Sequence, residues 1–177
     1  TVNMGGAVLL TSLAKARAAG VPEDRLIYPT GGASAEEPRD YLVRDQFYES
    51  HPQNAVLKAV MDLVEGDGKK FDAIELYSCF PCVPKMARRI LGWPVEKPAT
   101  VFGGLTFGGG PIANYMSHAV VSMVDKLRHE GTNGFLFANG GFATDNHCIV
   151  LSNKPVAAAH FPQNFDYQAE ADEAREA

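Results

Sequence analysis

The apolar residues of the chain fall into two patterns, which predict its secondary structure. Short continuous runs bounded by turn residues are typical of buried strands, and spacings of three and four are typical of helices with one apolar face. The predicted strands cover residues 6–11, 25–30, 71–77, 134–138 and 147–151, and the predicted helices cover 13–19, 54–64, 83–91 and 112–128. Because strands alternate with helices, we expect an α/β fold with a mainly parallel sheet, helix layers and a closing antiparallel strand pair.

Three segments carry further expectations. The run over 6–11 is predicted as a buried strand, followed by Ser12 as the N-cap of a short helix, although one helix over 4–19 is an alternative. Residues 31–41 are rich in Gly, Pro and charge, and are predicted as a surface loop. One domain is expected over 1–153, with an acidic, Ala-rich tail or linker over 154–177 that leads away from it.

Composition narrows the class of protein. The chain has 177 residues, 46% of them hydrophobic and 21% charged, which favours a globular domain over disorder. No apolar run approaches the roughly 18 residues of a membrane span, and no cluster of Lys and Arg suggests nucleic acid as a partner. Three cysteines, an odd and low number, indicate a reducing compartment, so we expect a cytoplasmic protein.

The stretch over 71–91 (FDAIELYSCFPCVPKMARRIL) predicts strand, turn and helix around a C-x-x-C motif, Cys79 to Cys82. A cysteine at the carboxyl end of a strand and the start of a helix is well placed for chemistry. A redox dithiol is one interpretation, and a zinc site completed by His147 and Cys148 is another. The simplest interpretation of Cys82 is a small buried residue on the helix face.

A glycine-rich run over 103–111 (GGLTFGGGP) and the pair Gly140–Gly141 allow three interpretations. They could bind phosphate before the helix that follows, let the backbone pass close to a neighbour, or place backbone N–H groups against a substrate carbonyl. The run lacks both the P-loop and the dinucleotide-binding patterns. His118 lies on the edge of an apolar helix face, where a structural role is the simpler interpretation.

Taken together, these motifs resemble the C-terminal half of the thiolase superfamily, in particular the sterol-carrier-protein-type thiolases and related acetyl-CoA acetyltransferase-like proteins. VNMGGAVLLTSLAKARAAGV resembles a segment at the end of the N-terminal half, which would assign about residues 1–20 to that half. ELYSCFP resembles N-E-A-F or H-D-C-F, GGLTFGGGP resembles G-G-x-x-x-x-G-H-P, and FLFANGGF resembles C-x-G-G. The resemblance covers residues 1 to about 152.

The resemblance implies roles for particular residues, and the sequence also departs from the family at two of them. Gly110 replaces the histidine of G-H-P, and Ala138 replaces the cysteine of C-x-G, while Cys79 matches the acid/base cysteine of H-D-C-F. His118 is a candidate replacement for the lost histidine. The implied catalytic residues are Cys79, Gly110, Gly140 and His118, and the implied substrate-binding residues are Tyr77, Ser78, Phe80, Gly109, Pro111 and Asn139.

The resemblance implies an acyl-CoA C-acyltransferase domain, acting in thiolysis of a 3-oxoacyl-CoA or the reverse condensation. The nucleophilic cysteine of the family lies in an N-terminal half, so we expect that half in the same parent chain or in a partner subunit, and a homodimer. Coenzyme A enters as a thioester substrate, with no metal and no other cofactor. Phe80, Phe107, Tyr115 and Phe142 are candidates for an apolar acyl site. The alternatives are a non-catalytic acyl-CoA-binding or assembly module and a dithiol oxidoreductase that uses Cys79 and Cys82.

Overall fold

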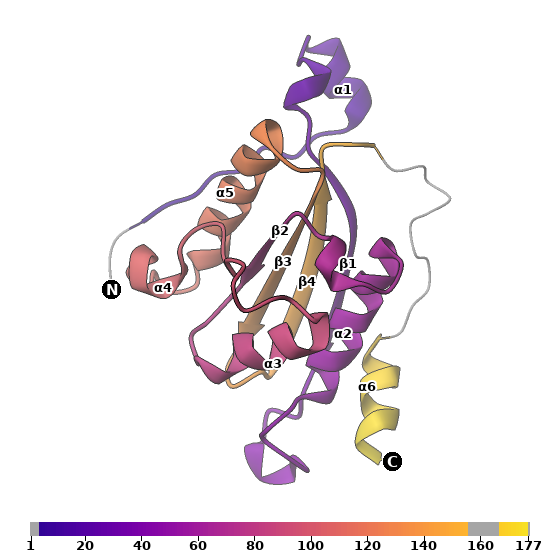
Figure 1. Ribbon diagram of the computed structural model, residues 1–177, viewed down its shortest axis with the longest axis vertical. Helices are drawn as coiled ribbons and strands as arrows, with labels where there is room; N and C mark the ends of the chain where they lie inside the picture. Colours follow the sequence, from indigo (N-terminus) through magenta and orange to yellow (C-terminus); the bar gives the residue numbers. More distant parts are fainter. Residues whose placement is uncertain (1–3, 156–166, 177) are drawn as a thin grey trace.

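The computed structural model describes residues 4–155 and 167–176, which contain one four-stranded sheet (Figure 1). Its strand order is β1 (Tyr28–Glu36), β4 (Asp145–Ser152), β3 (Asn133–Gly140) and β2 (Ala73–Leu76). β4 pairs antiparallel with both β1 and β3, whereas β3 and β2 are parallel. The α/β fold and the closing antiparallel hairpin are confirmed. Parallel pairing is less extensive than expected: of the three strand pairs in the described residues only β2–β3 is parallel, and the run over 6–11 contributes no strand.

One face of the sheet is covered by three helices, α2 (His51–Met61), α3 (Cys82–Leu91) and α6 (Tyr167–Glu176) (Figure 1). Ser50 caps α2 by accepting a hydrogen bond from the Gln53 N–H at 3.3 Å, so the helix begins three residues before the predicted start. α3 ends at Gly92, whose φ of 62° suits the left-handed C-cap. The apolar side chains of these helices and of β3 form the larger core.

The expectation that the C-terminal tail leads away from the domain is wrong for α6. Ala171 is fully buried among α2 and β1 side chains, and Gln168 bonds the backbone of edge strand β1. Its Oε1 accepts from the Glu36 N–H at 2.7 Å, and its Nε2 donates to the Glu36 carbonyl at 2.9 Å. The acidic, Ala-rich composition of the tail gave no indication that one face of its helix is buried. The rest of that predicted tail, over 156–166 and at 177, lies outside the described residues.

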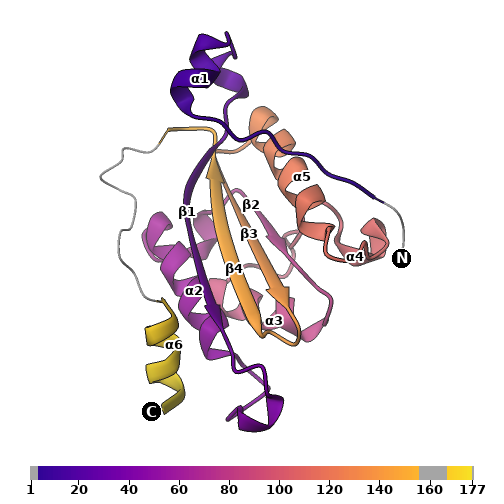
Figure 2. The ribbon, with the colours of Figure 1, turned by 180° about the vertical axis from the view of Figure 1, so that it is seen from behind.

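The opposite face is covered only in part, by α5 (Tyr115–His129) with the short α4 (Gly104–Gly108) beside it. Ala119, Met123 and Leu127 recur every four residues along α5 and pack on β2 and β3. Seen from behind, no helix lies in front of β1 and most of β4 (Figure 2), and Ile149 stays 36% exposed there. No helix in the described ranges has the length and apolar content that crossing a bilayer would require.

The predicted strand over 6–11 is wrong: the segment has no regular structure and is exposed, with Leu9 at 90% and Leu10 at 80%. It runs alongside α5, where Asn114 Nδ2 donates to the Met4 carbonyl at 2.6 Å. A strand needs a neighbouring strand to bond its backbone, and this sheet offers none on that side. The alternative of one helix over 4–19 is wrong too, because α1 spans only Leu13–Ala18, with Ser12 as the predicted N-cap.

The predicted surface loop over 31–41 is wrong in its first half, where residues 31–36 continue β1. The small residues are there because neighbours approach closely: a β-carbon at Gly32 would lie 2.7 Å from the Cys148 carbonyl oxygen. Ala33 and Ala35 belong to the core under α2. The remaining connections contain four short 3-10 helices: η1 (Glu23–Arg25), η2 (Tyr41–Val43), η3 (Asp62–Val64) and η4 (Gly68–Lys70).

Candidate functional site

Cys79 lies in the turn that joins β2 to α3, beside the end of the neighbouring parallel strand β3. The Tyr77 N–H bonds the Phe137 carbonyl at 3.0 Å, which keeps the chain paired to β3 just beyond β2. Because β2 and β3 are parallel, their carboxyl ends meet at the same edge of the sheet. The strand–turn–helix prediction is thus confirmed, and it brings the turn next to Asn139 on β3.

A hydrogen-bonded cluster forms around the Cys79 thiol. Cys79 Sγ donates to Asn139 Oδ1 at 3.6 Å, and Asn139 Nδ2 donates to the Tyr77 carbonyl at 3.4 Å. The amide of Asn139 is thereby fixed in orientation, and the residue is only 8% exposed. The structure therefore brings together three predicted site residues, Tyr77, Cys79 and Asn139.

The surroundings keep Cys79 protonated at neutral pH. Burial of the thiol is the main effect and raises its pKa above the ordinary cysteine value, although the residue as a whole is exposed. The Phe80 N–H and the Tyr77 hydroxyl hydrogen-bond the sulfur and lower the pKa by less. Burial also raises the pKa of Tyr77, with a smaller contribution from Cys79. A thiol held in this way is suited to donating a proton.

The other two cysteines lie in different surroundings. Cys82 is exposed at the first position of α3, not buried on the helix face as the simplest interpretation held. Cys148 is buried in the larger core, and burial raises the pKa of its thiol well above the ordinary value. His147 is exposed on the other face of β4, so the predicted zinc set does not assemble. Within 4–155 and 167–176, no group of three or more His, Cys, Asp or Glu side chains could hold a metal ion.

The glycine-rich run reaches the Cys79 turn at one point. A β-carbon at Gly104, where φ is 75°, would lie 4.0 Å from Ser78 Oγ. Further along, the Gly109 N–H is bonded to the Leu105 carbonyl at 2.9 Å, so it is not available to a substrate. The Gly110 N–H has no acceptor among the described residues, and its φ of 64° is one that glycine adopts readily.

The remaining predicted residues lie around this cluster without bonding it. His118 stacks on Phe102 with ring centroids 5.3 Å apart, and its Nε2 is buried without a hydrogen-bond partner in the described part of the chain. Pro111 is buried at the end of the glycine-rich run. Gly140 follows Asn139 on β3, where a β-carbon would lie 2.7 Å from Asp145 Oδ2.

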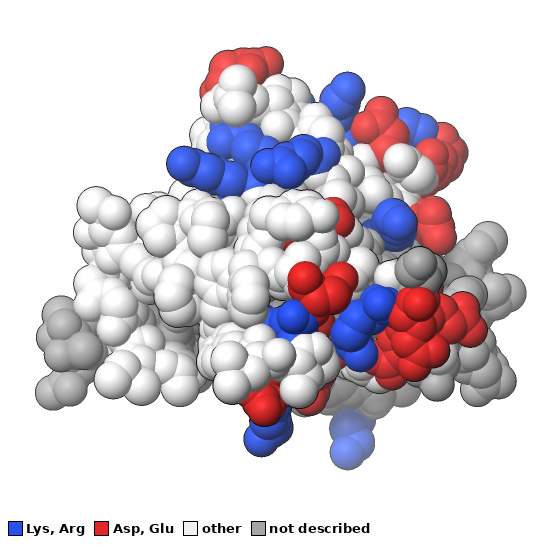
Figure 3. Space-filling view, turned by 90° about the horizontal axis from the view of Figure 1, so that it is seen from below, with Lys and Arg blue, Asp and Glu red and all other residues white. Residues whose placement is uncertain are grey.

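The aromatic candidates divide into two groups. Phe80 meets Phe142 edge to face at 5.3 Å, and Phe142 lies 6.4 Å from Phe47, so an apolar wall extends outward from the Cys79 turn. Tyr115, in contrast, is buried beneath the glycine-rich run, and Phe107 packs on Phe102. Seen from below, a broad part of the surface toward α4 and the N-terminal segment carries no Lys, Arg, Asp or Glu (Figure 3).

Sequence reasoning missed a buried carboxylate, Glu75, which lies in the middle of β2 and is 0% exposed. It accepts hydrogen bonds from Thr100, from the N–H groups of Val101 and Phe102, and from the Tyr115 hydroxyl. Burial and this bond to Glu75 raise the pKa of Tyr115. The available signal was an acidic residue inside a strand whose other residues are apolar, since buried carboxylates need partners.

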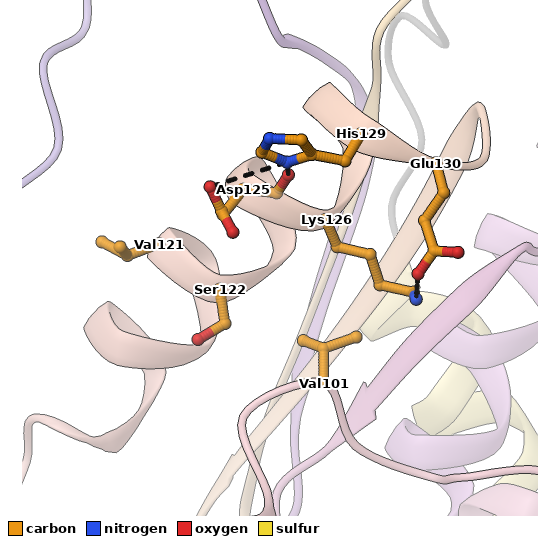
Figure 4. A pocket seen from close by; sticks show the side chains of 7 residues that line it. All are labelled: Val101, Val121, Ser122, Asp125, Lys126, His129 and Glu130. Atoms are coloured by element: carbon orange, nitrogen blue, oxygen red, sulfur yellow. Dashed lines mark hydrogen bonds and ion pairs between the residues drawn. The ribbon is translucent and has the colours of Figure 1, made fainter.

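A separate hollow of about 570 Å³ lies between α5 and the loop that carries Val101 (Figure 4). Its charged side chains pair with one another along the helix: Lys126 with Glu130, and His129 Nδ1 with Asp125 Oδ1 at 3.8 Å. The hollow shares no residue with the Cys79 cluster, and its charges are already compensated. It offers no alternative centre of chemistry.

Comparison with known proteins supports the thiolase likeness at the level of structure. No family model and no curated protein matches the sequence. Among solved structures, a monomeric SCP2-thiolase-like protein type 1 from Mycobacterium smegmatis is similar, with a TM-score of 0.79 and 28% sequence identity. The match covers 91% of this chain and 36% of that one, so this chain spans little more than a third of its length. The chain therefore has an SCP2-thiolase-like α/β fold.

Proposed function

We propose that the chain is the part of a thiolase-like acyl-CoA C-acyltransferase that supplies the acid/base cysteine. The observation that carries this proposal is the Cys79 thiol, held between Tyr77 and Asn139 where two parallel strands end. The SCP2-thiolase-like fold supports it, because the turn after β2 is where the sequence resembles the H-D-C-F motif.

The proposed reaction is thiolysis of a 3-oxoacyl-CoA. A cysteine thiolate outside these 177 residues attacks the 3-oxo carbon, and the C2–C3 bond breaks; the same thiolate is released when coenzyme A later takes the acyl group. The departing acetyl-CoA carbanion takes the proton of Cys79 Sγ, which suits a thiol that stays protonated at neutral pH. The resulting Cys79 thiolate then removes the proton of free coenzyme A, whose sulfur attacks the acyl-cysteine and releases the shortened acyl-CoA.

The substrate contacts follow from the surroundings of Cys79. The Gly110 N–H is a candidate donor to a thioester oxygen, and the wall of Phe80, Phe142 and Phe47 suits an apolar acyl group. The exposed apolar residues Leu9 and Leu10 support docking of an N-terminal thiolase half against this side of the chain. A homodimer stays a prediction; the similar solved protein is described as monomeric.

Two observations favour a second candidate, a thiolase-like module that binds acyl-CoA without turnover. The Gly109 N–H is already bonded to Leu105, and His118 lies against Phe102 instead of the Cys79 cluster. Loss of one oxyanion donor costs about 3 kcal/mol of barrier height. If Gly110 and Gly140 do not compensate, binding would remain while catalysis would not.

The test is acetoacetyl-CoA thiolysis by the intact protein that contains this chain, compared with its Cys79→Ala and Cys82→Ala variants. Both cysteines are exposed and lie three positions apart, so Cys82→Ala is a matched control. We expect turnover to be lost in Cys79→Ala and kept in Cys82→Ala. Loss in both variants would contradict the assignment of the acid/base role to Cys79 alone, and acyl-CoA binding without any turnover would indicate the binding module.

A further inference from the structure

Glu75 is a buried carboxyl group whose partners are hydroxyl and amide groups. One oxygen, Oε2, accepts from the Val101 N–H at 2.8 Å and the Phe102 N–H at 3.0 Å. The other, Oε1, accepts from the Tyr115 hydroxyl at 2.5 Å. A carboxylate that is fully removed from water needs such donors, and bonds to a charged acceptor are roughly twice as strong as neutral ones.

Thr100 extends this arrangement along the loop. Its Oγ1 lies 2.8 Å from both Glu75 oxygens and donates its proton to the carboxylate. The same oxygen accepts from the Gly103 N–H at 2.8 Å and the Gly104 N–H at 3.1 Å. Four successive backbone N–H groups, over 101–104, therefore converge on Glu75 and Thr100, which we call the Glu75–Thr100 clamp.

The clamp fixes the glycine-rich run against the Cys79 turn. Before the clamp, the Leu76 N–H bonds the Ala99 carbonyl at 2.9 Å, which ties the loop to the end of β2. After it, Gly104 faces Ser78, the residue that precedes Cys79. The N–H groups over 101–104 are turned inward and used up, so they cannot bind a substrate. The clamp instead determines where Gly110, six residues beyond Gly104, is held.

We propose that Glu75, acting through Thr100, is a positioning residue that places the glycine-rich run beside an acyl thioester bound at Cys79. This inference rests on the proposed function for its ligand, and on the clamp geometry for its mechanism. Glu75 and Thr100 themselves contact no substrate. Their effect on the reaction passes through the backbone that they hold.

The test compares Thr100→Val with Thr100→Ser in the intact protein. Valine has the shape of threonine but lacks the hydroxyl, whereas serine keeps the hydroxyl and lacks the methyl group. We expect Thr100→Val to raise amide hydrogen exchange at Gly103 and Gly104 by roughly tenfold or more. We also expect Thr100→Val to lower kcat for acetoacetyl-CoA thiolysis with little change in KM for coenzyme A. In Thr100→Ser, both the exchange rates and kcat should stay close to those of the unaltered protein.

Unchanged exchange in Thr100→Val would overturn the clamp, and faster exchange with an unchanged kcat would overturn its positioning role. If the unaltered protein binds acyl-CoA without turnover, kcat cannot serve as the readout. The readout is then the degree to which acetyl-CoA protects Cys79 from alkylation by iodoacetamide. Protection lost in Thr100→Val and kept in Thr100→Ser would support the inference after the proposed catalysis has failed. Protection kept in both variants, or absent even from the unaltered protein, would overturn it.

Discussion

The two faces of the sheet differ in how completely this chain covers them. On one face, α2, α3 and α6 enclose a continuous core that includes the fully buried Phe71, Phe135 and Phe137. On the other, α5 covers β2 and β3, while Ile149 on β4 and the apolar run over 6–11 stay exposed (Figure 2). Large exposed apolar patches are typical of interaction sites.

The two faces therefore have different roles. The covered face stabilises the fold, and the partly covered face contains the groups suited to chemistry. The core of the covered face is apolar, and Phe71, Phe135 and Phe137 are among its largest side chains. The partly covered face contains the Glu75–Thr100 clamp, Tyr115 and the glycine-rich run, which are polar or conformationally special groups. Cys79 lies at the edge where the two faces meet. We therefore expect it to be accessible to reagents, as the residues of the partly covered face are.

The largest expected effect concerns the cysteines of the two faces. Alkylation requires the thiolate and access to it. Cys148 is fully buried, so it should react with iodoacetamide at least roughly a thousand times more slowly than Cys79, at a rate limited by opening of the fold. Since burial raises the pKa of Cys79, the midpoint of its rate–pH profile should lie above that of an ordinary cysteine. Mass spectrometry of the two alkylated peptides, at a series of pH values, measures both rates. Comparable rates for Cys79 and Cys148 would show that the core of the covered face is open to the reagent.

Removal of a large core side chain should have the next largest effect. Phe135 is 0% exposed and stacks on Phe71 at 5.2 Å, so Phe135→Ala should lower the free energy of unfolding by about 3–5 kcal/mol. Urea unfolding of the 177-residue chain gives this value. Phe107→Ala, at an aromatic residue that is 76% exposed, is the control and should change it by less than about 1 kcal/mol. Equal losses of unfolding free energy in the two variants would contradict the distinction between the covered and the partly covered face.

The sequence predicted the elements that follow from local periodicity better than those that depend on neighbours distant in the chain, and the reasons are physical. The helices at α2 and α3 and the β3–β4 hairpin follow from local periodicity, which tertiary packing then reinforces. The segment over 6–11 has the composition of a strand, but strand formation depends on a neighbour that this sheet does not supply. Residues 31–36 have the composition of a loop, yet close packing beside Cys148 demands small residues in a strand.

The site shows the same limit. Cys79 and its turn were predicted from a strand–turn–helix pattern, and the contact with Asn139 follows from parallel pairing with β3. The Glu75–Thr100 clamp joins residues 25 positions apart through a loop without periodicity, so no local pattern indicates it. An isolated acidic residue in an apolar strand was the only signal.

Neutralising Glu75 should have an intermediate effect. In Glu75→Gln, one oxygen becomes an N–H₂ group, so at least one of the bonds to Val101, Phe102, Thr100 or Tyr115 loses its acceptor. We expect a loss of about 1–3 kcal/mol in the free energy of unfolding, measured in urea. Tyr115→Phe removes only the bond to Oε1 and should cost less. A Glu75→Gln variant as stable as the unaltered chain would show that the charge is not needed to hold the loop.

A smaller effect is expected where α6 joins the sheet. Gln168→Ala removes two hydrogen bonds to the backbone of Glu36, but this edge is exposed and water can replace them. The cost should be about 1 kcal/mol by thermal or urea unfolding. Gln168→Glu keeps the acceptor but turns a carboxylate oxygen toward the Glu36 carbonyl and Asp172 Oδ1, which now accept from the Gln168 Nε2, so it should cost more than Gln168→Ala. A cost above about 3 kcal/mol would mean that water does not replace these hydrogen bonds at the sheet edge.

Within the 177-residue chain, the smallest effect should come from the exposed N-terminal run. Leu10 is 80% exposed, so Leu10→Ser should change the free energy of unfolding of the 177-residue chain by less than about 0.5 kcal/mol. In the intact protein, where we propose that an N-terminal thiolase half docks on this side, the same substitution should cost about 2 kcal/mol, because the side chain is then buried. Parallel urea titrations of the two proteins measure the difference, with Leu42→Ser, at a residue 93% exposed on η2, as the control. Equal and negligible costs in both proteins would show that the open side of the sheet receives no such partner at this run.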